Sequence, residues 1–297
     1  MNRRFDVASI HLFRDCNMHC KFCYREKESL TTSKTLDWWE RLIPYLKKLD
    51  INQIAAGGGE PLMKPDWLYV LSRICSQNDI AFNFTTNGKL IETQRNTNRD
   101  NFYDSPFGRI PMFDWQSLLF EKTSMVSISF DSEKIKNKAD VESFTKTVKF
   151  LQQTYPHLKI GVNYLCDDDG LKNLLKRVRF FMDDLKLDRV FALSPKNFEN
   201  NILKYRQQYQ LLTMIYPKFM VDDLTKCIIE NNSYKNWKTP CHFGHVLSID
   251  ESGNVGGCSF DLGKVNVLKL GRPEDVMKLK DIDFKERFSC PYLMEGK

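Results

Sequence analysis

Short apolar runs alternate with longer amphipathic stretches along most of the chain, beginning at residue 7. The short runs are rich in β-branched and aromatic residues, and runs of this length and composition predict β-strands. Six strands are predicted in this way: residues 7–13, 53–56, 80–85, 125–130, 159–165 and 189–193. Because amphipathic stretches lie between them, we expect parallel strands joined by helices.

The stretches between the strands carry apolar residues at every third or fourth position, which is typical of amphipathic helices. The clearest set lies in residues 36–49 and consists of Trp39, Leu42, Ile43, Leu46 and Leu49. Residues 141–151, 171–185 and 202–216 are predicted to be helices too. Pro44 lies inside the first helix, where we expect it to cause a kink. The alternation of elements predicts an α/β fold around a parallel sheet.

Two segments depart from this alternation. Residues 92–113 are first polar and then rich in Phe, Tyr, Pro and Gly, and loops of this length are uncommon without a role. We expect them to form either a lid or an inert surface excursion. After residue 221 the composition turns to short strands, Gly and Cys. We therefore predict two domains, residues 1–221 and residues 222–297.

The composition is that of a soluble globular protein, with 42% hydrophobic and 28% charged residues. No apolar run approaches the roughly 20 residues that span a bilayer, and the N-terminus lacks the apolar core of a secretory signal. We therefore expect a cytoplasmic protein without a membrane partner. The formal net charge is +6, but the Lys and Arg residues are scattered among acidic ones, which favours a solvated surface over a nucleic-acid footprint.

The chain has 9 cysteines, and in a cytoplasmic protein these indicate metal sites rather than disulfides, because thiols are kept reduced there. Cys16, Cys20 and Cys23 lie directly after the first predicted strand. Three thiolates on one short loop can bind three irons of a cubane cluster and leave the fourth iron open to a small chelating molecule. The alternative is a zinc site in which His11 or His19 supplies the fourth ligand.

The loops after the next strands carry glycines and polar residues. The second strand is followed by Gly-Gly-Gly-Glu, residues 57–60. Glycines let a backbone approach a ligand closely and a carboxylate can bind a cationic amine, although a plain tight turn also fits this segment alone. The third strand ends in Thr-Thr-Asn-Gly, residues 85–88, and the fourth in Ser-Ile-Ser-Phe-Asp, residues 127–131. We expect these polar side chains to line a site, because packing does not require them at strand ends.

The spacing C-x3-C-x-aromatic-C, with Phe22 as the aromatic residue, and the following Gly-Gly-Glu resemble the signature of the radical S-adenosylmethionine (SAM) superfamily. The resemblance implies a partial, TIM-like barrel of six β/α units, written (β/α)6. It also implies that Cys16, Cys20 and Cys23 hold a 4Fe–4S cluster whose open iron binds SAM. Reduction of SAM would then release a 5'-deoxyadenosyl radical that removes a hydrogen atom from a substrate.

In that family, residues at the matching positions contact the other parts of SAM, and the resemblance implies the same roles here. The matching residues are Phe22 and Tyr24 for the adenine, Gly58, Gly59 and Glu60 for the amino group of the methionine part, Ser129 and Asp131 for the ribose, and Asn163 for SAM or the substrate. Capping of a strand end is a second interpretation of Asn163. Cys166, at the end of the fifth strand, would donate a hydrogen atom or a proton if it faces the site, whereas Cys75 is interpreted as a small buried residue.

A second group of cysteines follows residue 221. Residues 248–250 and 254–256 flank a Glu-Ser-Gly turn, a pattern that predicts a β-hairpin with cysteines near its open end. This arrangement resembles the hairpin of the SPASM and twitch domains, and the shorter twitch form fits the number of cysteines. The resemblance implies an auxiliary 4Fe–4S cluster in a small C-terminal hairpin and helix domain. Its implied ligands are Cys241, Cys258, Cys290 and, if the fourth iron is not open, Cys227. The alternative is a structural zinc ion held by the first three cysteines and His242 or His245.

For the substrate, the resemblance to SPASM and twitch enzymes favours a ribosomally made peptide that is cross-linked or epimerised. A second hypothesis is oxidation or rearrangement of a small molecule such as an aminocyclitol, a sugar or a nucleotide. Both require an electron donor, such as flavodoxin or ferredoxin. A third hypothesis, outside enzymology, is a zinc-stabilised nucleic-acid-binding module, although the scattered charges do not favour nucleic acid as a partner.

Overall fold

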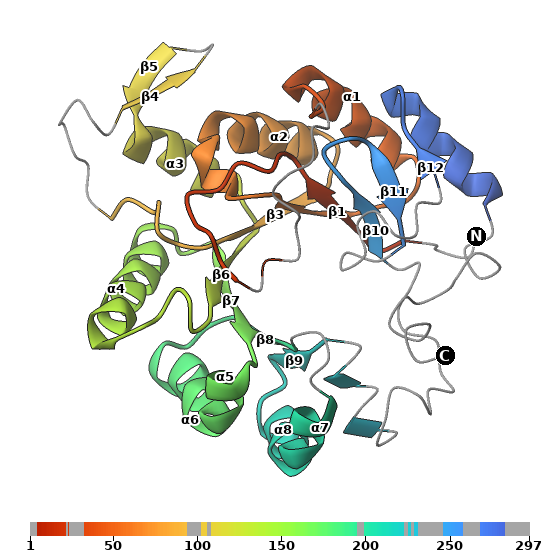
Figure 1. Ribbon diagram of the computed structural model, residues 1–297. Coiled ribbons are helices and arrows are strands. Elements are labelled where there is room, and N and C mark those ends of the chain that lie inside the picture. The colour runs from red at the N-terminus through yellow and green to blue at the C-terminus, as the bar shows by residue number, and fades with distance from the viewer. Residues whose placement is uncertain are drawn as a thin grey trace.

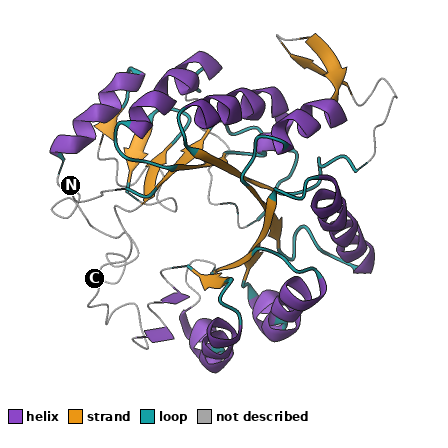
Figure 2. Ribbon diagram, turned by 180° about the vertical axis from the view of Figure 1, so that it is seen from behind, coloured by secondary structure: helices purple, strands orange, loops and turns teal. Residues whose placement is uncertain are grey.

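The computed structural model describes residues 5–21, 23, 33–93, 102–105, 108–194, 199–222, 225–226, 229–230, 246–257 and 268–282. At its centre is a curved sheet with helices on the outer, convex face (Figures 1 and 2). Part of this sheet is a run of parallel strands that neighbour one another in chain order. These strands are β1 (Val7–His11), β2 (Gln53–Gly57), β3 (Ala81–Thr86), β6 (Met125–Phe130), β7 (Lys159–Leu165), β8 (Arg189–Leu193) and β9 (Phe219–Val221).

The six predicted strands are all present, and the α/β fold with a parallel sheet is confirmed. Three of them have the predicted bounds, and the other three differ only at their ends. The strand β9 is absent from the prediction, because its three residues are too few to show an alternating pattern.

The four predicted helical stretches are helical in the structure, with two corrections. The described α-helices are α1 (Leu36–Lys47), α2 (Pro65–Gln77), α3 (Met112–Phe120), α4 (Lys138–Thr154), α5 (Asp168–Lys172), α6 (Leu174–Arg179), α7 (Glu199–Lys204) and α8 (Arg206–Ile215). The prediction of one helix over residues 171–185 is wrong, because Asn173 separates α5 from α6 and the π-helix Phe180–Asp184 follows. The Asn173 side chain donates to the backbone oxygen of Asp169 at 3.0 Å, a local bond that competes with helix continuation.

The second correction concerns residues 202–216, which are divided at Tyr205 between α7 and α8. By contrast, α1 continues through Pro44. None of the described helices is long and apolar enough to cross a bilayer.

Side chains alternate between the two faces of the sheet. On the outer face, Ile54, Phe84, Val126 and Val162 pack beneath the helices in one hydrophobic core. The side chains between them along β3 and β6 are half-buried and belong to the inner, concave face. In the part of the chain that the structure describes, helices cover the outer face (Figure 2).

The predicted excursion at residues 92–113 contains an antiparallel hairpin, β4 (Phe102–Ser105) with β5 (Gly108–Pro111). The hairpin forms a separate two-stranded sheet and leads directly into α3. Both views show it at the periphery, beyond α3 (Figures 1 and 2). The lid interpretation of this segment stays a prediction.

The predicted C-terminal hairpin is confirmed, and it extends the main sheet. Its strands β10 (Val246–Ile249) and β11 (Asn254–Gly256) are antiparallel, and β10 pairs in parallel with β1. Gly253 supplies the positive φ of 83° that the turn requires. The strand β12 (Leu268–Lys269) and the 3₁₀ helix Pro273–Asp281 follow, and that helix packs against α1. The boundary at residue 221 stays a prediction, and the described strands on its two sides share one sheet.

Candidate functional site

The predicted cluster cysteines lie on the loop that leaves the carboxyl end of β1. Cys16 and Cys20 are half-buried, Cys23 is exposed, and all three are free thiols. The backbone N–H of Cys23 donates to the carbonyl of Cys20 at 3.2 Å, and the N–H of Met18 donates to the sulfur of Cys16 at 3.4 Å. One short loop therefore presents all three thiols at the carboxyl edge of the sheet.

The Gly-Gly-Glu turn after β2 packs directly against this cysteine loop. Leu12 donates to the carbonyl of Gly57 at 3.1 Å, and Gly59 donates to the carbonyl of Phe13 at 2.8 Å. A Cβ atom on Gly59 would lie 1.8 Å from the carbonyl oxygen of Asp15, which no backbone can accept. From the sequence, these glycines were expected to let the backbone approach a ligand, and that role stays a prediction. In the structure they allow the close approach of the cysteine loop.

Gly58 adds a second constraint in the same turn. It has a φ of +144°, and a Cβ atom there would lie 2.6 Å from the carbonyl oxygen of Phe13. Both space and backbone conformation therefore exclude a side chain at this position.

The carboxylate of Glu60 is buried, with the residue 1% exposed, and it joins the turns after β2 and β3. It accepts hydrogen bonds from the Thr86 hydroxyl at 2.7 Å, the Asn87 N–H at 2.7 Å and the Leu62 N–H at 3.0 Å. It thereby caps the 3₁₀ helix Pro61–Met63 and holds the turn after β3. Burial raises the pKa of Glu60, although the hydrogen bonds and the charge of Lys134 oppose that shift. Binding of an amine by this carboxylate stays a prediction.

The turn after β3 also reaches the cysteine loop. The amide of Asn87 donates to the side-chain oxygen of Asn17 at 2.7 Å, and Asn17 lies between Cys16 and Cys20 in the sequence. Gly88 at the end of this turn has a φ of 79°, the left-handed conformation that favours glycine. The predicted Thr-Thr-Asn-Gly segment thus belongs to the same assembly as the cysteines and Glu60.

Asp131, predicted from the fourth strand, is engaged within its own turn. Its carboxylate forms an ion pair with Lys134 and accepts the backbone N–H groups of Glu133 and Lys134, each at 3.1 Å. The ammonium nitrogen of Lys134 also lies 3.9 Å from the sulfur of Cys20. Burial raises the pKa of the Cys20 thiol, while the charge of Lys134 lowers it and those of Asp131, Cys23 and Cys16 raise it.

Lys134 was not predicted from the sequence, where its place three residues after the strand-end Asp131 was the available signal. The ion pair between Arg14, in the cysteine loop, and Glu251, in the turn after β10, was not predicted either. Glu251 is fully buried, and its carbonyl accepts the N–H of Lys34 at 2.7 Å. The C-terminal hairpin is thus attached to the cysteine loop.

The described inner face of the sheet beside these loops carries uncharged polar side chains. Its half-buried hydroxyl and amide side chains are Ser9, Asn83, Thr85, Ser127, Ser129 and Asn163. Ser129 and Asn163 are neighbours in register, and the Asn163 amide donates to the Thr85 hydroxyl at 3.4 Å. The structure therefore brings the two predicted contact residues, Ser129 and Asn163, together on this face.

Cys166 lies fully buried, in contrast to the predicted cluster cysteines. Its thiol donates to the carbonyl of Tyr164 at 3.8 Å, and burial raises the pKa of the thiol to about 12. Its role as a donor of a hydrogen atom or a proton stays a prediction. Cys75 is also fully buried, as expected.

Six predicted site residues fall outside the described part of the chain. They are Phe22, Tyr24, Cys227, Cys241, Cys258 and Cys290. Their roles stay predictions.

The chemistry of Cys16, Cys20 and Cys23 fits a 4Fe–4S cluster. All three are free, Cys20 interacts electrostatically with both of the others, and the ammonium of Lys134 can offset thiolate charge. In the described ranges, no three His, Cys, Asp or Glu side chains lie close enough to share one metal ion. A cubane cluster does not require three side chains to meet at one ion, because each thiolate binds a separate iron.

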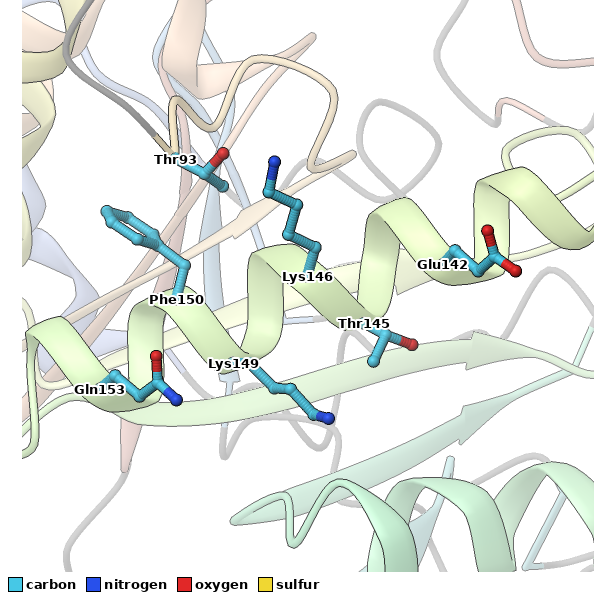
Figure 3. A pocket seen from close by; sticks show the side chains of 7 residues that line it. All are labelled: Thr93, Glu142, Thr145, Lys146, Lys149, Phe150 and Gln153. Atoms are coloured by element: carbon cyan, nitrogen blue, oxygen red, sulfur yellow. The ribbon is translucent and has the colours of Figure 1, made fainter.

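A surface hollow of about 540 Å³ lies elsewhere, between α4 and Thr93 (Figure 3). The residues that line it are Thr93, Glu142, Thr145, Lys146, Lys149, Phe150 and Gln153. None of them is a predicted site residue. The carboxyl edge of the sheet, rather than this hollow, is the candidate site.

Comparison with known families and proteins supports this location. Residues 10–101, which include the cysteine loop, the Gly-Gly-Glu turn and the turn after β3, match the radical SAM superfamily. The "Probable GTP 3',8-cyclase" of Methanococcus aeolicus is 31% identical over 96 residues, which is 31% of this chain and 32% of that protein. The match thus spans about a third of that relative's length. An S-adenosylmethionine-dependent nucleotide dehydratase of Fibrobacter sp. is 20% identical over 274 residues, covering 85% of this chain and 73% of that protein.

Solved structures show the same fold at low identity. Streptococcus suis SuiB bound to S-adenosylmethionine has a TM-score of 0.70 and 17% identity, covering 98% of this chain and 72% of that chain. The same protein bound to the precursor peptide SuiA has a TM-score of 0.64 and 16% identity, covering 99% of this chain and 66% of that chain.

Proposed function

Since the chain belongs to the radical SAM superfamily and is an enzyme, we propose that it uses Cys16, Cys20 and Cys23 to hold a 4Fe–4S cluster that binds SAM. When bound, the cluster supplies one electron to SAM, which yields methionine and a 5'-deoxyadenosyl radical that abstracts a hydrogen atom from the substrate. The observation that carries the proposal is the contact of the cysteine loop with the turns after β2 and β3, because all three segments lie within the family match.

The role of the protein in this chemistry is to position the cofactor and the substrate and to enclose them. The glycines at 58 and 59 fix the cysteine loop against the β2 turn, and Glu60 fixes the β3 turn beside it. Ser129 and Asn163 present hydroxyl and amide groups that suit the ribose or the substrate. The reactivity itself belongs to the cofactor.

For the substrate we propose a ribosomally made peptide that is cross-linked or epimerised. Two observations support this choice. SuiB, which shares the fold over nearly the whole chain, was solved with a precursor peptide. The inner face beside the site carries neutral hydroxyl and amide groups, which suit peptide groups better than a triphosphate, whose recognition favours Arg and Lys.

A nucleotide is the second candidate, because curated relatives are named as GTP cyclases and nucleotide dehydratases. Two anaerobic reactions with SAM and a reductant distinguish the candidates, one with a precursor peptide and one with nucleoside triphosphates. We expect formation of 5'-deoxyadenosine and a peptide product lighter by two hydrogens or containing an epimerised residue. Conversion of a nucleoside triphosphate with no change in the peptide would establish the nucleotide candidate.

We also propose an auxiliary 4Fe–4S cluster on Cys241, Cys258 and Cys290, whose fourth iron is either open to the substrate or bound by Cys227 or another side chain. Its support is the β10–β11 hairpin, which has the predicted position between two of these cysteines. Iron analysis after anaerobic reconstitution tests both clusters, with about eight irons per chain expected for two cubanes and about four for one. Stoichiometric zinc without iron would contradict both assignments.

The cysteine assignment has its own matched control. Replacement of Cys16, Cys20 and Cys23 by Ala should abolish 5'-deoxyadenosine formation and remove about four irons per chain. Cys75→Ala, a change at a buried cysteine in α2, should retain both. Normal SAM cleavage by the triple variant would contradict the assignment.

A further inference from the structure

Lys134 is a buried cation at the edge of the proposed cluster site. It lies in the loop between β6 and α4, and the residue is 8% exposed. A buried ammonium group is costly unless charged or polar groups compensate it. Its nitrogen pairs with the carboxylate of Asp131 and lies 3.9 Å from the sulfur of Cys20.

The turn after β6 holds this cation in place. Asp131 accepts two backbone N–H groups at 3.1 Å with one carboxylate oxygen and pairs with Lys134 through the other. The carbonyl of Asp131 also accepts the N–H groups of Lys134 at 3.1 Å and Ile135 at 2.9 Å. The side chains of Lys134 and Asp131 are 9% and 3% exposed, so solvent and salt screen the ammonium weakly. The ammonium is therefore held in a fixed position beside Cys20.

We propose that Lys134 tunes the reduction potential of the cluster through an N–H···S contact with Cys20. The inference rests on the proposed function, because it takes Cys20 to be a cluster ligand. Reduction adds one negative charge to a cluster, and a nearby positive charge or a hydrogen bond to a ligand sulfur favours the reduced form. The electron that reduces the cluster comes from an external donor. Lys134 acts through Cys20 and is a positioning and tuning residue rather than a catalytic one.

The test compares reconstituted wild type, Lys134→Met and Lys134→Arg without SAM, in an anaerobic redox titration followed by electron paramagnetic resonance. At the wild-type midpoint potential, Lys134→Met should lower the ratio of reduced to oxidised cluster about tenfold, which is a shift of about 59 mV for one electron. Lys134→Arg keeps the charge and should stay within about twofold of wild type. The matched control is Lys138→Met, because the Lys138 side chain is 92% exposed and pairs with Glu142 on α4. It should leave the ratio unchanged.

Lys134→Met leaves the carboxylate of Asp131 buried without its cation, which can prevent folding. A second comparison, of Asp131→Asn with the double variant Asp131→Asn and Lys134→Met, removes that difficulty. The double variant should show the same tenfold fall relative to Asp131→Asn.

An unchanged ratio in the second comparison would overturn the inference and leave Lys134 as a structural counter-ion of Asp131. A wild-type protein that takes up no iron would overturn the proposed function instead. Iron content and midpoint potential therefore distinguish the two failures.

Discussion

Single residues of the candidate site matter as much for the space they leave as for the groups they carry. Gly59 has no side chain to offer, yet the cysteine loop could not lie where it does if a Cβ atom occupied that position. Glu60 beside it carries a carboxylate, and three donors from two segments already use it. The Gly-Gly-Glu turn therefore holds the loops of the candidate site in place, independently of any ligand that the site binds.

Gly59→Ala should destabilise the protein by about 1–3 kcal/mol, because the new methyl group would lie 1.8 Å from a backbone oxygen and the cysteine loop would have to move. The loss should appear as a lower midpoint of thermal unfolding and as reduced iron uptake. The matched control is Gly57→Ala, where the nearest atom to an added Cβ is 3.7 Å away. Equal stability of the two variants would contradict the packing role of Gly59.

At the scale of elements, the β10–β11 hairpin links the C-terminal part of the chain to the cysteine loop. Because β10 runs parallel to β1, its following turn lies at the same edge of the sheet as the loop with the cysteines. Asp250 shapes that turn by accepting the N–H groups of Ser252 at 2.9 Å and Asn254 at 2.8 Å. The turn then presents Glu251 to Arg14.

Glu251→Gln should weaken this link, because the amide loses the charge that pairs with Arg14 in a buried position. We expect a loss of about 1–3 kcal/mol in the free energy of unfolding, measured by chemical denaturation. Glu274→Gln is the matched control, since its pair with Arg272 has side chains 41% and 75% exposed, and it should change stability by less than about 0.5 kcal/mol. Equal losses in the free energy of unfolding would show that the buried pair stabilises the protein no more than the exposed pair.

At the scale of the whole molecule, the curved sheet collects loops that are distant in the sequence at one edge. The carboxyl ends of β1, β2, β3 and β6 bring the cysteines, Glu60, Asn87 and Lys134 together, while the helices occupy the outer face. SuiB has the same fold at a TM-score of 0.70. This edge is therefore where we expect a ligand to stabilise the fold.

Iron-loaded protein should gain about 2.7 kcal/mol of stability when SAM is present at 100 times its dissociation constant, because the ligand binds the folded state alone. The gain should appear as a higher midpoint in anaerobic thermal unfolding. The variant with Ala at positions 16, 20 and 23 lacks the proposed open iron and should gain much less. A full gain in that variant would show that SAM does not need the cluster for binding.

Local patterns in the sequence were sufficient to predict six parallel strands, the place of three cysteines on one loop and the C-terminal hairpin. Burial of alternate residues and the chemistry of a turn depend on neighbours along the chain, so they are visible without a fold. The breaks at Asn173 and Tyr205 and the strand β9 were not visible, because a side-chain bond to the backbone and a three-residue strand leave no periodic signal.

The tertiary structure alone decided which of these pieces meet. It placed Lys134 beside Cys20, Glu251 beside Arg14, and β10 beside β1, and each pair joins segments far apart in the sequence. It also assigned the glycines after β2 to the packing of a loop. Such contacts depend on the path of the whole chain, because space and charge at a position are set by residues that fold beside it. The sequence alone therefore predicted three cysteines on one loop. Only the tertiary structure decided which residues lie beside them.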